Sequence, residues 1–381
     1  MLRSTDRILT THTGSLPRPA DLIEMIRARQ QGNYGDEAAF QARVRDAVRE
    51  VVQLQKDAGI DIVSDGEEGK PSYATYVKDR LTGFEGTNTT RIRIQGEAPD
   101  FPEYTERRMA TTATILVRPT CNGPIAWKDF EAVERDVANF KAAVEAVKPV
   151  GAFMTAASPG VVAFFLPNEY FKNDDEYLDA LCAVMKDEYE AITNAGFELQ
   201  LDCPDLAMSR QSQFADLPTS DFRKIVERHV EVVNEATKNI DPDQMRLHLC
   251  WGNYEGPHHM DVPMRDIVDI VLKGRPSIIS FEGANPRHEH EWNVWQDVKL
   301  PAGKVLMPGV IDSTTNFIEH PELVSQRIQS YARLVGKENV LAGVDCGFGT
   351  NAASTTVDPK IAWAKLRTLV EGAQMASKAL W

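Results

Sequence analysis

Long apolar runs, cysteine and positive charge are all scarce in this 381-residue chain. No segment approaches the roughly 18 consecutive apolar residues of a membrane-spanning helix. Residues 1–7 are charged where a secretory signal would need an apolar stretch. We therefore expect a cytoplasmic protein that does not enter a membrane.

The scarcity of thiols and cations excludes further classes of protein. The five cysteines form an odd, widely scattered set, unlike the disulfide framework of a small secreted domain. Metal binding or burial of these thiols is therefore favoured over disulfide bonds. Lys and Arg number 42 against 56 Asp and Glu, giving a net charge of -14. Because nucleic acids and anionic membranes are bound by clustered Lys and Arg, we expect neither as a partner.

Short apolar runs alternate with longer amphipathic segments, a pattern typical of a parallel sheet with crossover helices. Helical periodicity is clearest over residues 37–58 and 174–195, each with a glycine at its end. The runs predicted to be strands are 8–11, 60–64, 152–155, 198–202, 245–250, 278–282, 305–311 and 341–345. Eight strands, each followed by a helix, predict a single α/β domain over residues 1–381, a (β/α)8 TIM barrel.

One stretch departs from this alternation. Residues 84–120, after the second predicted strand, contain two short segments with strand-like patterns, 91–94 and 113–117. We interpret them as a β-hairpin insertion that reaches over the mouth of the barrel. A helix predicted over residues 127–147 then returns the chain to the barrel.

Polar residues and glycines gather at the carboxyl ends of the predicted strands, where barrels of this kind hold their active sites. His248 and Cys250 are two residues apart on one strand, so their side chains share a face and offer half of a zinc site. Glu282 and Cys346, at two later strand ends, would supply a carboxylate and a second thiolate. The competing interpretation is chance, because free cysteine is commonly just a small buried side chain.

Six motifs together resemble the catalytic domain of cobalamin-independent methionine synthase. In chain order they are 11–18 (THTGSLPR), 65–67 (DGE), 201–204 (LDCP), 248–250 (HLC), 280–282 (SFE) and 345–347 (DCG). The resemblance spans nearly the whole chain but does not include that enzyme's long amino-terminal domain. The short single-barrel members of the superfamily, which include epoxyalkane:coenzyme M transferase, are the most similar in organisation.

The resemblance implies that His248, Cys250, Glu282 and Cys346 bind Zn2+, with the glutamate as the ligand most readily displaced. The family's thiol substrate binds the metal as a thiolate, which removes the need for a separate base. A free thiol, with a pKa of about 8.5, is mostly protonated at neutral pH.

Other family positions imply contacts with the substrate. Ser15 matches a turn that holds the substrate carboxylate through its backbone. Glu67 and Asp202 match acidic residues that bind the substrate amino group, which favours an amino-acid thiol. A solvated loop carboxylate is the alternative for Glu67. His12, at the end of the first strand, is either a proton relay or a structural histidine.

Two departures from the family pattern fall on its folate side. Residues 313–315 (STT) stand where the family has a histidine implicated in methyl transfer, and residues 158–165 replace a tryptophan-bearing loop that meets the pterin. The thiol-activating half therefore matches the family, whereas the half that binds the alkyl donor differs.

The leading hypothesis is zinc-dependent methyl or alkyl transfer to a small thiol such as homocysteine. One alternative is addition of a thiol such as coenzyme M to an epoxide. Others are a lyase or decarboxylase on the same barrel, and a barrel that only stores zinc. His258–His259 and residues 288–290 are weaker candidates for metal ligands. The expected partners are a small-molecule thiol and an alkyl donor, and a homo-oligomer is left open.

Overall fold

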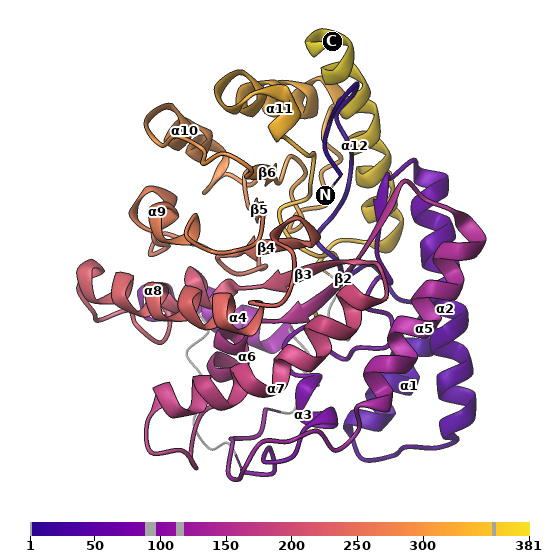
Figure 1. Cartoon of the computed structure of the whole chain (residues 1–381), viewed down its shortest axis with the longest axis vertical. Helices are drawn as coiled ribbons and strands as arrows, with labels where there is room; N and C mark the ends of the chain where they lie inside the picture. The colour runs from indigo at the N-terminus through magenta and orange to yellow at the C-terminus, as the bar shows by residue number, and fades with distance from the viewer. Residues whose placement is uncertain (1, 88–96, 112–117, 353–355) are drawn as a thin grey trace.

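The computed structural model describes residues 2–87, 97–111, 118–352 and 356–381 (Figure 1). Within them, parallel strands form one six-stranded sheet in the order β1-β2-β3-β4-β5-β6. The strands are β1 (Ile62–Val63), β2 (Gly151–Ala157), β3 (Glu198–Asp202), β4 (Met245–Leu249), β5 (Ile278–Phe281) and β6 (Val305–Pro308). Figure 1 shows them as part of a barrel with helices around its outer side. The predicted α/β class and parallel sheet are confirmed.

Two of the eight predicted strands, at 8–11 and 341–345, are not strands in the described part of the chain. Isolated parallel bridges join Thr10 to Ala342 and Leu306 to Val340. Ile62 N–H donates to Thr10 O over 3.1 Å, so these segments connect β6 to β1. A continuous parallel ladder between β6 and residues 341–343 would need the backbone N–H of residue 308 to donate to the carbonyl of Leu341. Residue 308 is a proline and has no N–H. The arrangement is consistent with a barrel, although the prediction of eight regular strands was too high.

The long helices begin and end where local signals predict. Helix α2 (Glu37–Ala58) begins after Asp36, whose side chain accepts from Ala39 N–H, and ends at Gly59 with φ 87°. The helix predicted from residue 127 begins later, as α5 (Glu131–Val147).

The other helices complete the outer layer. The α-helices are α1 (Ala20–Gln30), α3 (Val77–Arg80), α4 (Pro102–Thr111), α6 (Pro159–Phe165), α7 (Asp174–Asn194), α8 (Thr219–Ala236), α9 (Val268–Val271), α10 (Val294–Asp297), α11 (Pro321–Val335) and α12 (Pro359–Leu380). The short 3-10 helices are η1 (Ala98–Asp100), η2 (Pro204–Leu206), η3 (Met208–Gln211), η4 (Pro242–Gln244), η5 (Met264–Asp266), η6 (Glu289–Asn293) and η7 (Lys337–Asn339). Among the described residues, no helix is both long and apolar enough to cross a membrane.

The two arms of the predicted hairpin, 91–94 and 113–117, lie outside the described residues. The described chain between them is helical, as η1 and α4. Tyr254 Oη donates to Glu97, and His259 Nε2 lies 2.9 Å from Asp100 Oδ2. The insertion therefore contacts the loop that follows β4, at the carboxyl end of the sheet.

Buried side chains also fill the inside of the sheet. An inner cluster of Leu9, Ile62, Phe153, Ile278, Val305, Met307 and Leu341 joins segments from both ends of the chain. Arg246 is fully buried beside it, with its guanidinium carbon 3.4 Å from the centre of the Phe153 ring. Burial lowers the pKa of Arg246 to about 10, and Glu198 lies 3.4 Å away as its carboxylate partner. The interior is thus filled by side chains, so a site for a ligand is expected at the carboxyl ends of the strands.

Candidate thiol and metal site

Three of the four predicted metal ligands meet at the carboxyl ends of their segments. His248 lies on β4, and Cys250 is the first residue after that strand. Cys346 is the first residue after the extended segment 341–345. One ligand atom from each lies within 4.8 Å of the others, and the two Sγ atoms are 3.7 Å apart. All three residues are buried. One imidazole and two thiols so placed form a set that zinc prefers.

The histidine is oriented as a metal ligand would be. Its Nδ1 lies 3.1 Å from Ser280 Oγ on the neighbouring strand, whereas Nε2 is buried and has no hydrogen-bond partner in the described structure. Burial lowers the pKa of His248 to about 3, so the ring is neutral. A neutral imidazole with one nitrogen held by a neighbour and the other unpaired fits a metal ion.

The Cys250 thiol has a hydrogen-bond partner on each side. Cys346 is the main cause of the raised pKa of Cys250, and burial adds to it. Gly252 N–H donates to Cys250 Sγ over 3.3 Å. The Cys250 thiol therefore stays protonated by itself, and a cation bound beside it would reverse that preference.

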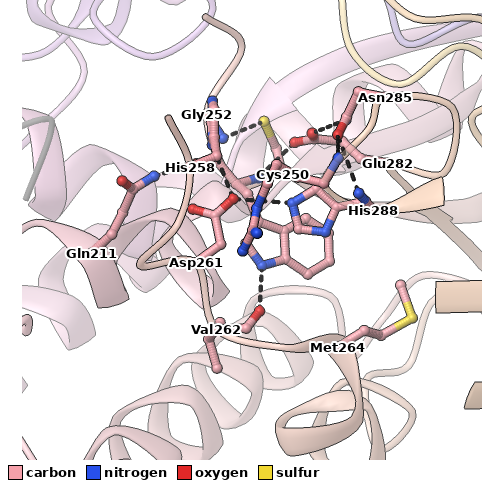
Figure 2. A network of polar contacts seen from close by, with 12 residues as sticks. Gln211, Cys250, Gly252, His258, Asp261, Val262, Met264, Glu282, Asn285 and His288 are labelled. Atoms are coloured by element: carbon pink, nitrogen blue, oxygen red, sulfur yellow. Dashed lines mark hydrogen bonds and ion pairs between the residues drawn. The ribbon is translucent and has the colours of Figure 1, made fainter. Parts of the chain in front are cut away.

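Glu282, the fourth predicted ligand, is not one of the three residues of this group, but it lies near Cys250 (Figure 2). Trp251 N–H donates to its Oε1 over 2.7 Å, and Asn285 Nδ2 donates to its Oε2 over 2.8 Å. Burial and the nearby Cys250 raise the pKa of Glu282 well above its ordinary value. The carboxylate is therefore held next to Cys250 by two donors.

Asp345, which the sequence analysis gave no role, connects Glu282 to Cys346. Its Oδ1 accepts from Gly283 N–H and Ala284 N–H, and its Oδ2 from Asn285 N–H, each over 2.8 Å. Burial raises its pKa to about 6. Its position directly before Cys346 was the only signal in the sequence, and that signal does not specify which loop it binds.

His258 and His288, from the two weaker candidate pairs, form an ionic network with Asp261 (Figure 2). Asp261 Oδ2 lies 2.9 Å from His258 Nδ1 and 3.1 Å from His288 Nε2. Burial lowers the pKa of His288, but hydrogen bonds to Asp261 and Glu291 outweigh it and raise that pKa to about 10. The His288 ring also lies 4.2 Å from that of Trp251, centre to centre. The network therefore packs against Trp251, whose backbone N–H donates to Glu282.

His288→Gln is expected to destabilise the protein by a few kcal/mol at pH 6, since it removes the buried cation that Asp261 and Glu291 share and leaves Asp261 with His258 alone. His288 has a folded pKa raised from 6.5 to about 10. Its stabilising effect is therefore fully present below pH 6.5 and is lost as the pH rises towards 10. Urea unfolding at pH 6 and pH 9 measures this, with exposed His290→Gln as the control. A difference between wild type and His288→Gln that does not change with pH would contradict the protonated network.

The predicted amine-binding carboxylates also lie together. Glu67 is 2% exposed, so it is not a solvated loop acid, and Thr155 Oγ1 donates to its Oε1 over 2.9 Å. Its other oxygen is buried without a partner in the described structure. Gln200 Nε2 donates to Asp202 Oδ1 over 2.8 Å. Burial, then the charge of Glu67, raises the pKa of Asp202 well above its ordinary value. A bound cation would relieve this repulsion.

The turn that carries Ser15 packs between these carboxylates and Cys346. A Cβ on Gly14, whose φ is 125°, would lie 2.9 Å from Glu67 Oε1, and a Cβ on Gly347 would lie 1.9 Å from Ser15 Oγ. Only glycines allow these approaches. The Ser15 hydroxyl is itself buried without a partner among the described residues.

His12 uses both ring nitrogens within the protein. Its Nε2 lies 2.7 Å from Gln55 Oε1, and its Nδ1 accepts from Gly14 N–H over 3.2 Å. Burial lowers its pKa to about 4. These contacts favour the structural alternative over the proton relay, because neither nitrogen is left to meet a substrate.

Tyr73 is a site residue that the sequence did not indicate. Burial, then the charges of Cys250 and Cys346, then that of Asp202, raises its pKa well above the ordinary value. Its phenol thus lies near both the thiols and the carboxylates. It comes in a loop well after β1, and nothing in its sequence context distinguishes it from a packing aromatic.

The fold and this set of side chains define a class: an α/β protein of barrel type with a candidate metal site at its strand ends. A family model, the catalytic domain of cobalamin-independent synthase, matches residues 8–139. Methionine synthase of Saccharolobus solfataricus is 24% identical over 97% of this chain and 95% of its own length. That of Thermococcus kodakarensis is 25% identical over 97% of this chain and 94% of its own.

Solved structures agree with these sequence relatives. A B12-independent methionine synthase from Shewanella sp. W3-18-1, in complex with selenomethionine, superposes with a TM-score of 0.75 at 20% identity, covering 98% of this chain and 99% of its own. A vitamin-B12-independent methionine synthase described as putative, from Listeria monocytogenes, superposes with a TM-score of 0.64 at 19% identity. The match covers 97% of this chain and 98% of that one. The resemblance inferred from the sequence motifs is confirmed: the chain is similar to the cobalamin-independent synthase catalytic domain over residues 8–139 and to methionine synthases over 97% of its length.

Proposed function

We propose that this protein is an enzyme that transfers a methyl or other alkyl group to the sulfur of a small thiol such as homocysteine. The observation that carries the proposal is the group His248, Cys250 and Cys346, with ligand atoms within 4.8 Å of one another. Relatives named methionine synthase along 97% of the chain support the same chemistry. Zinc is the metal that this donor set favours, with Glu282 as its fourth, displaceable ligand.

A zinc ion held there would keep a substrate thiol deprotonated at neutral pH. The residues of the chain do the rest. Ser280 orients His248 and leaves Nε2 free to bind such an ion, and Trp251 N–H and Asn285 would hold the Glu282 carboxylate whether or not it is a ligand. The sulfur lone pair forms the new S–C bond, the donor's bond to that carbon breaks, and the leaving group keeps the electron pair.

The carboxylates select the thiol. Glu67 and Asp202 are buried beside each other, and an ammonium group between them would satisfy both. The turn at Ser15 lies against Glu67 and the Cys346 segment, where it would hold the carboxylate of the same amino acid. The pair therefore favours an amino-acid thiol over an amine-free thiol such as coenzyme M.

The same proposal covers the organisation of the chain. We propose a single (β/α)8 barrel over residues 1–381 that acts in the cytoplasm on small molecules. A decarboxylase of this barrel type needs no metal, so clustered thiols with an unpaired imidazole nitrogen favour thiol transfer over it. A protein that only stores zinc has no use for the buried carboxylates Glu67 and Asp202.

Purified protein is expected to contain about one zinc per chain by elemental analysis, because the donor set is complete enough to retain it. Chelation should abolish transfer of alkyl groups to L-homocysteine, and added zinc should restore it. Assays would pair L-homocysteine and 2-mercaptoethanesulfonate with methyl donors and epoxides. A protein that binds no zinc even after reconstitution would refute the proposal and favour the lyase and decarboxylase alternatives.

A further inference from the structure

Arg118 is a half-buried cation that forms no ion pair with any of the described residues. Its guanidinium carbon lies 4.9 Å from the centre of the Phe165 ring, on α6. Its Nε is buried and has no hydrogen-bond partner in the described structure. Burial lowers its pKa from 12.5, yet a guanidinium stays charged in proteins.

The absence of a carboxylate is not an effect of the undescribed segments. Among the described residues, no carboxylate forms an ion pair with Arg118, and residues 1, 88–96, 112–117 and 353–355 contain no Asp or Glu. Other buried arginines are compensated: Arg80 pairs with Asp136 and Glu188, and Arg18 donates to three backbone carbonyls. A buried cation without a counter-charge is costly, and function is a common reason for keeping one.

Tyr73 connects Arg118 to the thiols. The Tyr73 and Phe165 rings meet edge to face, with centres 6.0 Å apart. Burial, then the charges of Cys250 and Cys346, raises the pKa of the Tyr73 phenol, and the charge of Arg118 opposes that rise, so both the thiols and the cation act on this phenol. Phe165 also ends the segment 158–165, which by the sequence resemblance stands where the family has its pterin-facing loop. That resemblance implies that Arg118 lies on the donor side of the site.

We propose that Arg118, together with Phe165 and Tyr73, binds an oxyanion carried by the alkyl donor: a carboxylate, sulfonate or phosphate. This inference rests on the proposed function, because it assumes a donor that reacts beside the thiols. The planar guanidinium offers paired N–H donors that match two oxygens of such a group, and the Phe165 ring orients that plane. Tyr73 O–H supplies a further donor on the side nearer the thiols.

The experiment titrates acetate and methanesulfonate into zinc-loaded protein by calorimetry at low ionic strength, where screening is weak. Arg118→Gln is expected to weaken binding of both anions at least tenfold, and Arg118→Lys to retain part of it. Arg29→Gln is the matched control, since Arg29 also packs on an aromatic ring, Phe40 at 4.2 Å, but on the outer helix α1. Equal anion affinity in wild type and Arg118→Gln would overturn the proposal.

A second titration, with L-homocysteine already bound, assigns the oxyanion to one substrate. If it belongs to the donor, the anions bind with unchanged affinity; competition would overturn the donor assignment. Zinc content and homocysteine binding are measured on the same samples. If zinc and homocysteine bind normally but Arg118→Gln does not change the anion affinity, this inference alone fails. Absent zinc with Arg118-dependent anion binding means that the proposed function fails.

Discussion

Cys346→Ser protein is expected to purify folded but nearly free of zinc, and to transfer alkyl groups on the order of a thousandfold more slowly than wild type. A serine hydroxyl is a poor zinc ligand, and the remaining His248 and Cys250 leave the metal site incomplete. Metal activation of a nucleophile contributes several kcal/mol, and each 1.4 kcal/mol is about tenfold in rate. Cys250→Ser should behave in the same way. Elemental analysis and a transfer assay on the same preparation measure both effects.

The matched control is Cys182→Ser, which changes another buried cysteine, on α7, whose thiol donates to the Val232 carbonyl over 3.7 Å. It should keep its zinc and its activity. The far-ultraviolet circular dichroism spectrum should match wild type in every variant, which separates loss of metal from loss of fold. Full activity in a zinc-free Cys346→Ser protein would refute the assignment of the site.

Asp202→Asn is expected to weaken binding of an amine-bearing thiol such as homocysteine by roughly 30- to 5,000-fold, with little effect on an amine-free thiol. Truncating one partner of a buried charge pair costs about 2–5 kcal/mol. Asp202 is 5% exposed and lies at the end of β3, so bulk water does not screen the lost charge. Titration calorimetry with L-homocysteine and with 2-mercaptoethanesulfonate measures the two affinities.

Glu67→Gln provides the companion test, because Glu67 faces the same ammonium group in the proposal. It should show the same selectivity with a similar loss. Zinc content should stay at the wild-type level in both variants, since neither residue belongs to the metal group. Equal losses for the two thiols would remove the reason for preferring an amino-acid substrate.

The candidate ligands were predictable because their signals are local. The two-residue repeat of a strand places His248 and Cys250 on one face, and the parallel arrangement brings the ends of successive strands to one edge. The helix over residues 37–58 was predicted to its last residue, since Asp36 and Gly59 are strong local caps. Pro308 shows the opposite case: it lies within a predicted strand, yet its missing N–H matters only once Leu341 lies beside it.

The sequence by itself determined the chemical types at the strand ends, the alternation of strand and helix, and the resemblance to a family. Only the tertiary structure decided which of these groups meet. Cys250 and Cys346 are 96 residues apart and come within 3.7 Å because β4 and the segment 341–345 end at the same edge. Arg118 and Tyr73, from loops without periodicity, both pack on the Phe165 ring. Hydrogen-bonding patterns repeat locally and leave a trace in the sequence, whereas contacts between loops depend on closure of the whole sheet.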